Sequence, residues 1–191
     1  MTLILSSAKE IINMANLDRE RIVDMALQLL DTRGFDGLTM RALAKRLHIE
    51  NPALYWHFKN KQEIVDAMAA RILERAVVRR RHDESWQRWL SRTARALRNA
   101  LRSYRDATRI VAEADLSDTP WIEAQQQACA ELEREGFPPK SALVAIVTLS
   151  DFTLGATWEQ EADPAQPRRG GKAMFEAGIA IIIAGIEHTL P

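Results

Sequence analysis

Side chains suited to binding chemistry gather in one short stretch, residues 49–65, which reads IENPALYWHFKNKQEIV. It holds three aromatic rings, one histidine and two lysines. Hydroxyl, imidazole and ammonium groups donate hydrogen bonds to phosphate oxygens, so Tyr55, His57, Lys59 and Lys61 predict contacts with a nucleic-acid backbone. Such contacts position a protein on a duplex without reading its base sequence.

The same stretch divides into two faces when it is read as a helix. Leu54 and Phe58 are four residues apart and share one face, where we expect them to pack inward. Asn51 and Ala53 stand at the exposed start of the helix, where side chains can meet base edges. The stretch is therefore predicted to be part of a core on one side and a reading surface on the other.

Catalytic chemistry has little support in the sequence. The single cysteine, Cys129, has no evident histidine partner, and there is no glycine-rich phosphate loop. The histidines lack the spacing of metal ligands and are scattered at His48, His57, His82 and His188. We therefore expect neither an enzyme nor a protein that holds a metal or a cofactor.

Two short helices must position the binding side chains. Thr39 can cap a helix over 40–47, and an Asn-Pro pair opens a second helix over 51–58, because proline is favoured in a first turn. A turn of three or four residues separates them. This is the helix-turn-helix arrangement, which lays its second helix in the major groove of DNA.

Longer helices are predicted on either side of this pair. Asp18 can cap a helix over about 18–33, and Gly34 is placed to end it in the left-handed conformation. Asn60 and Glu63 read as a capping box that starts a helix over about 61–80.

The remainder of the chain predicts longer helices and no strands. The expected ranges are about 85–104, 105–115, 120–136, 138–160 and 172–189, with a turn-rich loop over 162–171. The expected fold class is all-α. We predict a three-helix DNA-binding domain at 17–62, a larger helical bundle at 63–191 and an N-terminal extension at 1–16.

Composition is compatible with a soluble cytoplasmic protein. One cysteine excludes an internal disulfide, and the longest apolar run, 177–186, is too short to span a bilayer. Net charge is zero, yet residues 1–82 carry 14 Lys/Arg against 10 Asp/Glu, whereas 83–191 carry 12 against 16. The basic half is the one that holds the predicted phosphate contacts.

The stretch GFDGLTMRALAKRLHIENPALYWHFKNKQEIVDAM resembles the DNA-binding domain of the TetR (tetracycline repressor) family. The similarity covers about residues 18–75. Its signature elements are Gly34, Gly37-Leu38-Thr39, Leu43-Ala44, Leu47, Leu54-Tyr55-Trp56-His57-Phe58 and Lys59-Asn60-Lys61. The Trp-His pair, together with ESWQRWL, YRDA, REGF and FTLG in the second part, is similar to the tetracycline-repressor subgroup.

The resemblance implies a set of DNA contacts. By position, the family's contacts fall on Met40, Arg41, Asn51, Pro52, Ala53 and Tyr55, with His57 and Lys61 beside them. Thr39 and Lys59 complete the predicted DNA-binding set. Arg41 is the best candidate to pair with guanine O6 and N7, with a single phosphate contact as the alternative. For Lys59 the alternative is a solvated lysine.

The resemblance also implies a homodimer whose bundle encloses a small-molecule pocket. The helices at 138–160 and 172–189 are more apolar than a monomer surface tolerates, so a second copy is expected to cover them; the alternative is that they form the chain's own core. Small residues would allow close helix approach at Ala177, Gly178, Ala180, Ala184 and Gly185.

The expected effector is more apolar than tetracycline. The two pocket histidines of the subgroup correspond here to Val77 (or Ala76) and Val111, although Glu159 matches a glutamate that helps hold the drug-bound metal. Without imidazole ligands, a magnesium–tetracycline chelate is not expected. The residues expected around the effector, each of which could equally be core, are Thr93, Leu97, Leu101, Tyr104, Val111, Trp121, Phe152, Trp158 and Glu159.

The sequence thus predicts a regulator, most simply a repressor, that leaves a palindromic operator when an effector shifts the 61–80 helix. Two alternatives stay open: a helical protein-interaction module, and a DNA-binding protein that needs no ligand. A further set of arginines recurs every three or four residues, at Arg88, Arg92, Arg95, Arg98, Arg102, Arg105 and Arg109. It is either a site for an anionic partner or a solvated stripe paired with acidic neighbours.

Overall fold

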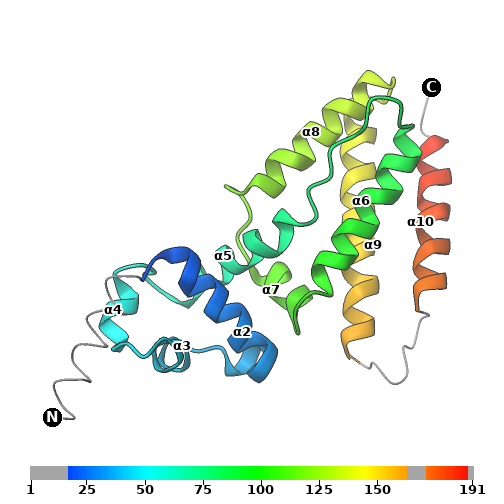
Figure 1. The fold of residues 1–191 in the computed structure, drawn as a ribbon. Helices are drawn as coiled ribbons and strands as arrows, with labels where there is room; N and C mark the ends of the chain where they lie inside the picture. The colour runs from blue at the N-terminus through cyan, green and yellow to red at the C-terminus, as the bar shows by residue number, and fades with distance from the viewer. Residues whose placement is uncertain (1–16, 163–170, 189–191) are drawn as a thin grey trace, which may run out of the picture. The chain divides into compact units, whose positions relative to one another are not determined.

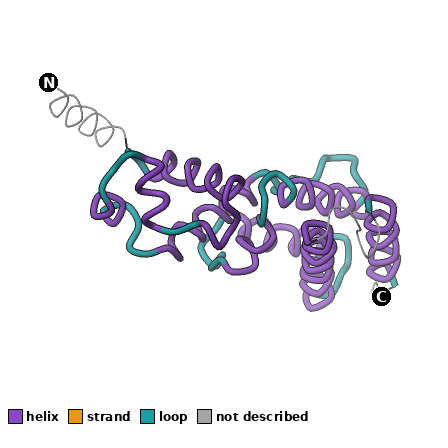
Figure 2. Tube along the Cα trace, turned by 90° about the horizontal axis from the view of Figure 1, so that it is seen from below, coloured by secondary structure: helices purple, strands orange, loops and turns teal. Residues whose placement is uncertain are grey.

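The computed structural model describes residues 17–162 and 171–188, with side chains described for 17–158 and 171–188 (Figure 1). This part of the chain consists of helices and loops without a strand, which confirms the all-α class (Figure 2). The helices are α2 (Arg19–Gly37), α3 (Met40–Leu47), α4 (Asn51–Tyr55), α5 (Lys61–Glu74), α6 (Trp86–Leu101), α7 (Ala107–Glu113), α8 (Pro120–Arg134), α9 (Pro139–Ala162) and α10 (Lys172–Glu187). The predicted extension at 1–16 lies outside the described residues.

The chain forms two compact units. The first, which we call the head, comprises the residues up to Arg71 together with Tyr104–Ala114; the second, the bundle, comprises Ile72–Ser103 and the residues from Asp115 onward. The sequence placed the boundary at 62/63 instead. The difference arises because most of α5 packs with the head and because α7 returns to it from a distant part of the chain.

Local capping sets the helix starts in the head as predicted. The Asp18 carboxylate accepts the Arg21 N–H at 2.7 Å, and the Thr39 hydroxyl accepts the Ala42 N–H at 3.1 Å. Gly34 does adopt a positive φ of 68°, but its ψ of 179° makes a kink, after which helical turns continue to Gly37. The end predicted near residue 33 therefore coincides with this break, and a short second helical stretch follows it to Gly37.

The helices α4 and α5 are shorter than predicted. The first ends at Tyr55 rather than Phe58. The second starts with the expected capping box, in which Asn60 Oδ1 accepts the Glu63 N–H at 2.9 Å, but it ends at Glu74 rather than residue 80. A turn follows Glu74, and in the irregular segment beyond it the Val78 carbonyl accepts Trp89 Nε1–H at 2.9 Å.

The bundle packs α6, α8 and α10 around α9 (Figure 1). Its core is made mainly of aromatic and aliphatic side chains: Trp86, Trp89, Leu90, Ala94, Ala128, Leu132, Phe137, Ala142, Ala145, Ile146, Leu149, Phe175, Ile179, Ile183 and Ile186. Gly136 follows the end of α8 and has a φ of 98°, a backbone conformation that glycine adopts readily.

Gly178 is needed for the packing of α10 on α9. A Cβ atom built there would lie 2.2 Å from Cζ of Phe152, whose ring stacks on Phe175 with centroids 5.7 Å apart. Gly178→Ala is therefore expected to lower the free energy of unfolding by about 1–3 kcal/mol through overpacking. Gly155→Ala, where a Cβ meets nothing within 4 Å, should instead raise it through helix propensity. Urea unfolding followed by circular dichroism measures both; equal stability for the two variants would contradict this packing role.

Large apolar side chains on the outer side of α9 and α10 remain exposed within one chain. They include Leu143 at 55% exposure, Val144 at 54% and Ile181 at 73%. Between the two helices runs a groove of about 420 Å³ lined by Val144, Ile182, Gly185 and neighbours. The stretch Pro139–Trp158 has the length and composition of a membrane span with 33% of it buried, but the core helix of a soluble protein passes the same test.

Candidate nucleic-acid interface and effector cavity

The helix-turn-helix presents the face that the sequence predicted. Leu43, Leu47, Leu54 and Phe58 are buried at 6% exposure or less, so the inner side of α3 and α4 belongs to the core of the head. On the other side Trp56 is 88% exposed. An aromatic ring so exposed on a short helix is not explained by packing within this chain, which favours a binding surface.

The predicted DNA-contacting residues occupy the accessible side of this unit. Thr39, Arg41, Pro52, Tyr55 and Lys59 are exposed, and Met40, Asn51, Ala53, His57 and Lys61 are half-buried. The structure thus brings the members from α3 and α4 and the Lys59–Lys61 run onto one compact unit. Lys61 differs from the expectation in one respect: its Nζ lies 4.2 Å from the centroid of the Phe35 ring.

The turn between α3 and α4 holds a histidine in a conformation that glycine prefers. His48 caps α3 with φ 56° and ψ 45°, and its N–H bonds the carbonyls of Ala44 and Lys45. A Cβ atom is unfavourable in this region. His48→Gly is therefore expected to stabilise the head by about 1 kcal/mol, a rise of about 2–4 °C in Tm. The control Glu50→Gly, at φ −76°, should give no rise in a thermal melt; a Tm for His48→Gly no higher than wild type would contradict the argument.

The segment around α7 is bound to the end of α2. The Asp106 carboxylate accepts the Phe35 N–H at 2.8 Å, and the Asp31 carboxylate accepts the Arg105 N–H at 2.9 Å. Gly34 permits this approach, since a Cβ there would lie 2.8 Å from Asp106 Oδ2.

Cationic and polar contacts complete this attachment. The guanidinium of Arg109 lies 4.2 Å from the Phe35 ring centroid, the same distance as the Lys61 ammonium, and it forms an ion pair with Asp36 at 3.0 Å. The Gln62 amide donates to the Glu113 carbonyl at 2.8 Å. Hydrogen bonding to Glu113 also raises the pKa of Arg109. One segment of the C-terminal part is therefore a structural component of the DNA-binding head.

A small interior cavity lies among the bundle helices. Its volume is about 40 Å³, and it is lined by residues 76–78, by α6, by α8 and by α9. Most of the lining is apolar. The polar groups are the Thr93 hydroxyl, which is buried without a hydrogen-bond partner, and the Gln125 amide, which donates to the Ser150 hydroxyl at 3.3 Å. A buried hydroxyl without a partner in the protein is costly, and a water molecule or a polar ligand atom could satisfy it.

The residues predicted around the effector are only partly brought together. Thr93 and Trp121 line the cavity, and so do Ala76 and Val77, the two positions compared with a pocket histidine. Leu97 and Leu101 are buried in α6, and Phe152 stacks on Phe175.

The remaining predicted effector residues lie elsewhere. Tyr104 and Val111 belong to the head, and Trp158 is 47% exposed. The side chain of Glu159 lies outside the described part of the chain.

Sequence reasoning missed Trp89, Gln125 and Ser150 as cavity residues. A signal was present for Gln125, because it continues the buried stripe of α8 formed by Trp121, Ala128 and Leu132. A polar residue within an apolar stripe at helical spacing points into a core or a cavity. Trp89 offered no such signal, since a tryptophan at a buried helical position is ordinary core.

The arginine stripe is largely paired with acidic neighbours. Arg92 forms an ion pair with Glu84, Arg95 donates to both carboxylate oxygens of Glu176, and Arg109 forms an ion pair with Asp36. Arg98 is buried, at 6% exposure, and its guanidinium lies 4.7 Å from the Phe175 ring centroid. The chain also leaves the helical path between α6 and α7, so the arginines do not form one continuous face.

The head exposes one face of a helix-turn-helix, and the same chain adds a separate helical bundle with an interior cavity. This combination defines a DNA-binding transcriptional regulator rather than an enzyme. Two family models match the chain: bacterial regulatory proteins of the tetR family over residues 22–68, and the tetracyclin repressor-like C-terminal domain over 80–174. The chain belongs to the TetR family of transcriptional regulators.

Individual relatives support the same assignment. The chain is 42% identical to tetracycline repressor protein class D of Escherichia coli, over 78% of this chain and 68% of that protein. It is similar to the structure of TetR (class A) in complex with 5a,6-anhydrotetracycline and magnesium, with 38% identity, a TM-score of 0.78 and coverage of 91% and 99%. A structure of BioQ with its double-stranded DNA operator matches at 31% identity, TM-score 0.76, with coverage of 91% and 99%.

Proposed function

We propose that this protein is a homodimeric cytoplasmic repressor that binds a palindromic operator and leaves it when a small molecule enters the bundle. Relatives that bind operator DNA or a tetracycline support the two activities separately. The observation that carries the proposal is the division of α3 and α4 into a buried side and an exposed side that bears Arg41, Tyr55 and Trp56.

The proposed contacts fall into two groups. Residues 51–53 meet base edges, because the N-terminal residues of a recognition helix, here α4, reach deepest into the groove; Arg41 of α3 reaches a base edge with its long side chain. Tyr55, His57, Lys59 and Lys61 bind phosphates and set the register of the protein on the duplex. The ammonium of Lys59 is 88% exposed and 4.0 Å from Glu63, which leaves it available to a phosphate.

The experiment that tests this function is selection of bound duplexes from a random library, read by sequencing. A palindromic site with two equal half-sites is expected from a dimer. Binding without enrichment that fades as salt rises would mean phosphate contact only. That result would favour the protein-interaction module instead.

For the effector we propose a largely apolar molecule that binds without a metal ion. The described side chains around the interior cavity include no histidine and no carboxylate, which are the groups that would hold a chelated cation. A cavity of this composition favours an apolar body with one hydrogen-bonding atom near Thr93 and Gln125. Thermal-shift screening with and without magnesium tests this: stabilisation by tetracyclines that requires magnesium would overturn it.

The attachment of α7 to α2 offers a physical link between effector and DNA. Asp106, the residue that precedes α7, is five residues from the end of α6, and α6 contributes Trp89, Leu90 and Thr93 to the cavity lining. A change in α6 on effector binding would be transmitted through this short connection to the Phe35 backbone. The coupling needs only that effector and operator prefer different positions of α7.

Asp106→Ala removes the carboxylate that accepts the Phe35 N–H. Operator and effector binding are each expected to persist, while effector-induced release weakens about fivefold, a loss of about 1 kcal/mol of coupling. Fluorescence anisotropy of labelled operator, titrated with effector, measures the release. Asp118→Ala, an exposed acid with the same change of charge, should behave as wild type. Full release in Asp106→Ala would show that the coupling does not pass through this contact.

A further inference from the structure

A short irregular segment separates the interior cavity from a second, larger hollow in the bundle. We call this segment, residues 77–82 between α5 and α6, the strap. On its inner side is the interior cavity; on its outer side a groove of about 560 Å³ runs between the strap and α8. Val77, Val78, Trp89, Ala124 and Ala128 line both hollows. The wall between them is therefore one layer of side chains.

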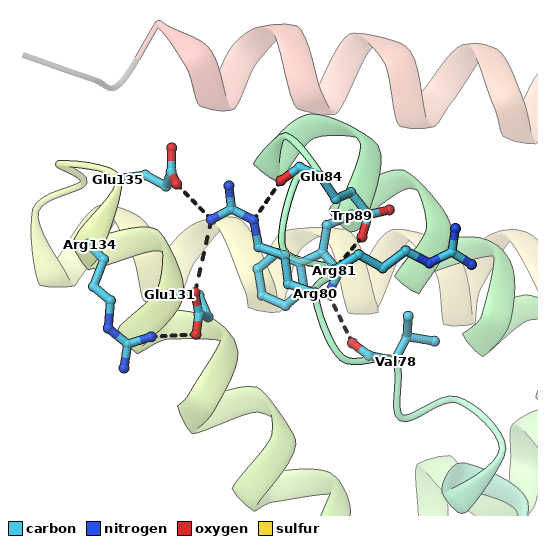
Figure 3. A network of polar contacts seen from close by, with 8 residues as sticks. All are labelled: Val78, Arg80, Arg81, Glu84, Trp89, Glu131, Arg134 and Glu135. Atoms are coloured by element: carbon cyan, nitrogen blue, oxygen red, sulfur yellow. Dashed lines mark hydrogen bonds and ion pairs between the residues drawn. The ribbon is translucent and has the colours of Figure 1, made fainter.

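The strap is held by a few hydrogen bonds to its backbone. Trp89 Nε1–H donates to the Val78 carbonyl at 2.9 Å, and Arg92 donates to the Arg79 carbonyl at 2.9 Å (Figure 3 shows the Trp89 contact). The Arg81 N–H donates to the Glu84 carboxylate at 3.1 Å. The hydrogen bonds from Arg92 hold the pKa of Glu84 down to about 2, so this anchor is intact at neutral pH and weakens only as pH falls from about 4.5 toward that value.

One arginine of the strap reaches across the groove to α8. Arg80 Nη1 lies 2.7 Å from Glu135 and 4.0 Å from Glu131, while its Nε–H donates to the Glu84 carbonyl at 2.8 Å. Figure 3 shows the Arg80 guanidinium between the acids of α8 and the strap, and the Arg81 side chain directed the other way. The Arg80 side chain is 18% exposed and that of Glu135 is 36% exposed, so the acid is the more accessible partner.

The two hollows differ in what they can hold. The interior cavity, at about 40 Å³, has room for little more than a water molecule or two, whereas ligand sites are typically about 300–1,000 Å³. The groove reaches that range. A ligand that uses the apolar interior must therefore extend into the groove or displace the strap.

The groove combines an apolar wall with a positive edge. The wall is formed by Val77, Val78, Trp89, Ala124 and Ala128. Three arginines and a histidine of the strap line the groove, opposite Glu131 of α8 and Glu135 directly after that helix. A planar guanidinium that already holds a carboxylate is suited to exchange it for the carboxylate or sulfonate of a ligand without burying a new unpaired charge.

We propose that the groove is the outer half of the effector site and takes an amphipathic aromatic anion, whose ring system packs on the wall and whose acid group replaces Glu135 on Arg80. This proposal rests on the proposed function and specifies its ligand. The ring system contacts Trp89 and the two valines of the strap, and it reaches the interior cavity when the strap moves. Glu135 acts as an internal competitor for the ligand's acid group.

A pair of fluorescent probes tests the anion requirement. 8-Anilinonaphthalene-1-sulfonate and N-phenyl-1-naphthylamine share one ring system, but only the first carries a sulfonate. Both are titrated into the full-length dimer, followed by probe emission and by energy transfer from tryptophan. The expected result is tighter binding of the sulfonate by about tenfold, because a charge-assisted pair with Arg80 adds to the shared apolar contact. Equal affinities for the two probes would overturn the proposal.

Matched variants show whether Arg80 and Glu135 are the residues that set the preference for the sulfonate probe. Arg80→Gln should remove the preference for the sulfonate, while Arg134→Gln, which removes an arginine from α8 that does not line the groove, should keep it. Glu135→Gln should tighten the sulfonate several-fold and leave the neutral probe unchanged; Glu133→Gln, also outside the groove, should change neither. A preference that survives in Arg80→Gln, or a Glu135→Gln protein with wild-type affinities, would show that the anion binds elsewhere. If Arg80→Gln does not fold, the Glu135→Gln result decides alone.

Operator binding by the same proteins without any probe separates this proposal from the proposed function. If the protein binds its operator but binds the two probes equally, the anion site is rejected and the proposed function as a DNA-binding regulator stands. The reverse result, a sulfonate preference that depends on Arg80 in a protein that binds no operator, would keep the site and reject the repressor.

Discussion

Ile181→Glu is expected to convert the dimer into monomers and to abolish tight operator binding. Ile181 is 73% exposed on α10, next to the groove that α10 and α9 form with Val144 and Ile182. Exposed aliphatic side chains of this size, contiguous along two helices, indicate a surface that a second copy covers. A carboxylate buried there without a partner costs several kcal/mol, and the two-fold symmetry of a homodimer introduces it twice.

The effect on DNA follows from the loss of the second head. A dimer binds two half-sites at once, and a monomer retains only one set of contacts, so operator affinity should fall by about 100-fold or more. Sedimentation velocity at micromolar protein measures the dissociation, and anisotropy of labelled operator measures the affinity. Gln126→Glu introduces the same charge at an exposed position on α8 and should remain dimeric. If Ile181→Glu sediments as a dimer, the α9–α10 face is not the interface.

Arg41→Ala is expected to remove sequence preference at one position in each half-site. Arg41 is exposed at the start of α3, behind the Thr39 cap that fixes where the helix begins. A bidentate arginine–guanine contact provides about 1–3 kcal/mol of discrimination against other bases, and a dimer makes it twice. The operator affinity should therefore fall about 30-fold or more, while affinity for unrelated duplexes changes little.

The control for this prediction is another arginine of the same helix. Arg46 is directed toward α2, where its guanidinium contacts Met25 Sδ at 3.2 Å and Gln28 Oε1 at 3.4 Å. Arg46→Ala should leave the selected site unchanged. A uniform loss of affinity in Arg41→Ala on every duplex, with a smaller dependence on salt, would instead assign Arg41 to a phosphate.

Features that depend on a few neighbouring residues could be predicted from the sequence. The caps at Asp18, Thr39 and Asn60 formed as expected, and Gly34 took the positive φ predicted for it. These features follow from local hydrogen bonding and from the absence of a Cβ, so no distant part of the chain is needed to foresee them. The all-α class and the buried side of the helix-turn-helix follow from helical spacing in the same way.

Features that join distant residues appeared only in the tertiary structure. Nothing near residues 104–114 indicates that they belong to the head, because the partner of Asp106 is Phe35, 71 residues earlier. The segment after α5 likewise bonds to distant residues: Trp89 donates to the Val78 carbonyl, and Arg80 meets Glu135, 55 residues later.

Features set by neighbouring residues and features set by distant contacts differ for a simple physical reason. The sequence by itself determined the helices, the reading face and the family, because each rests on short-range periodicity, capping and a motif of contiguous residues. Only the tertiary structure decided which segment completes the head and where a ligand fits. Those outcomes depend on which side chains satisfy backbone carbonyls and charges far away in the chain, and many pairings are equally compatible with the same local pattern.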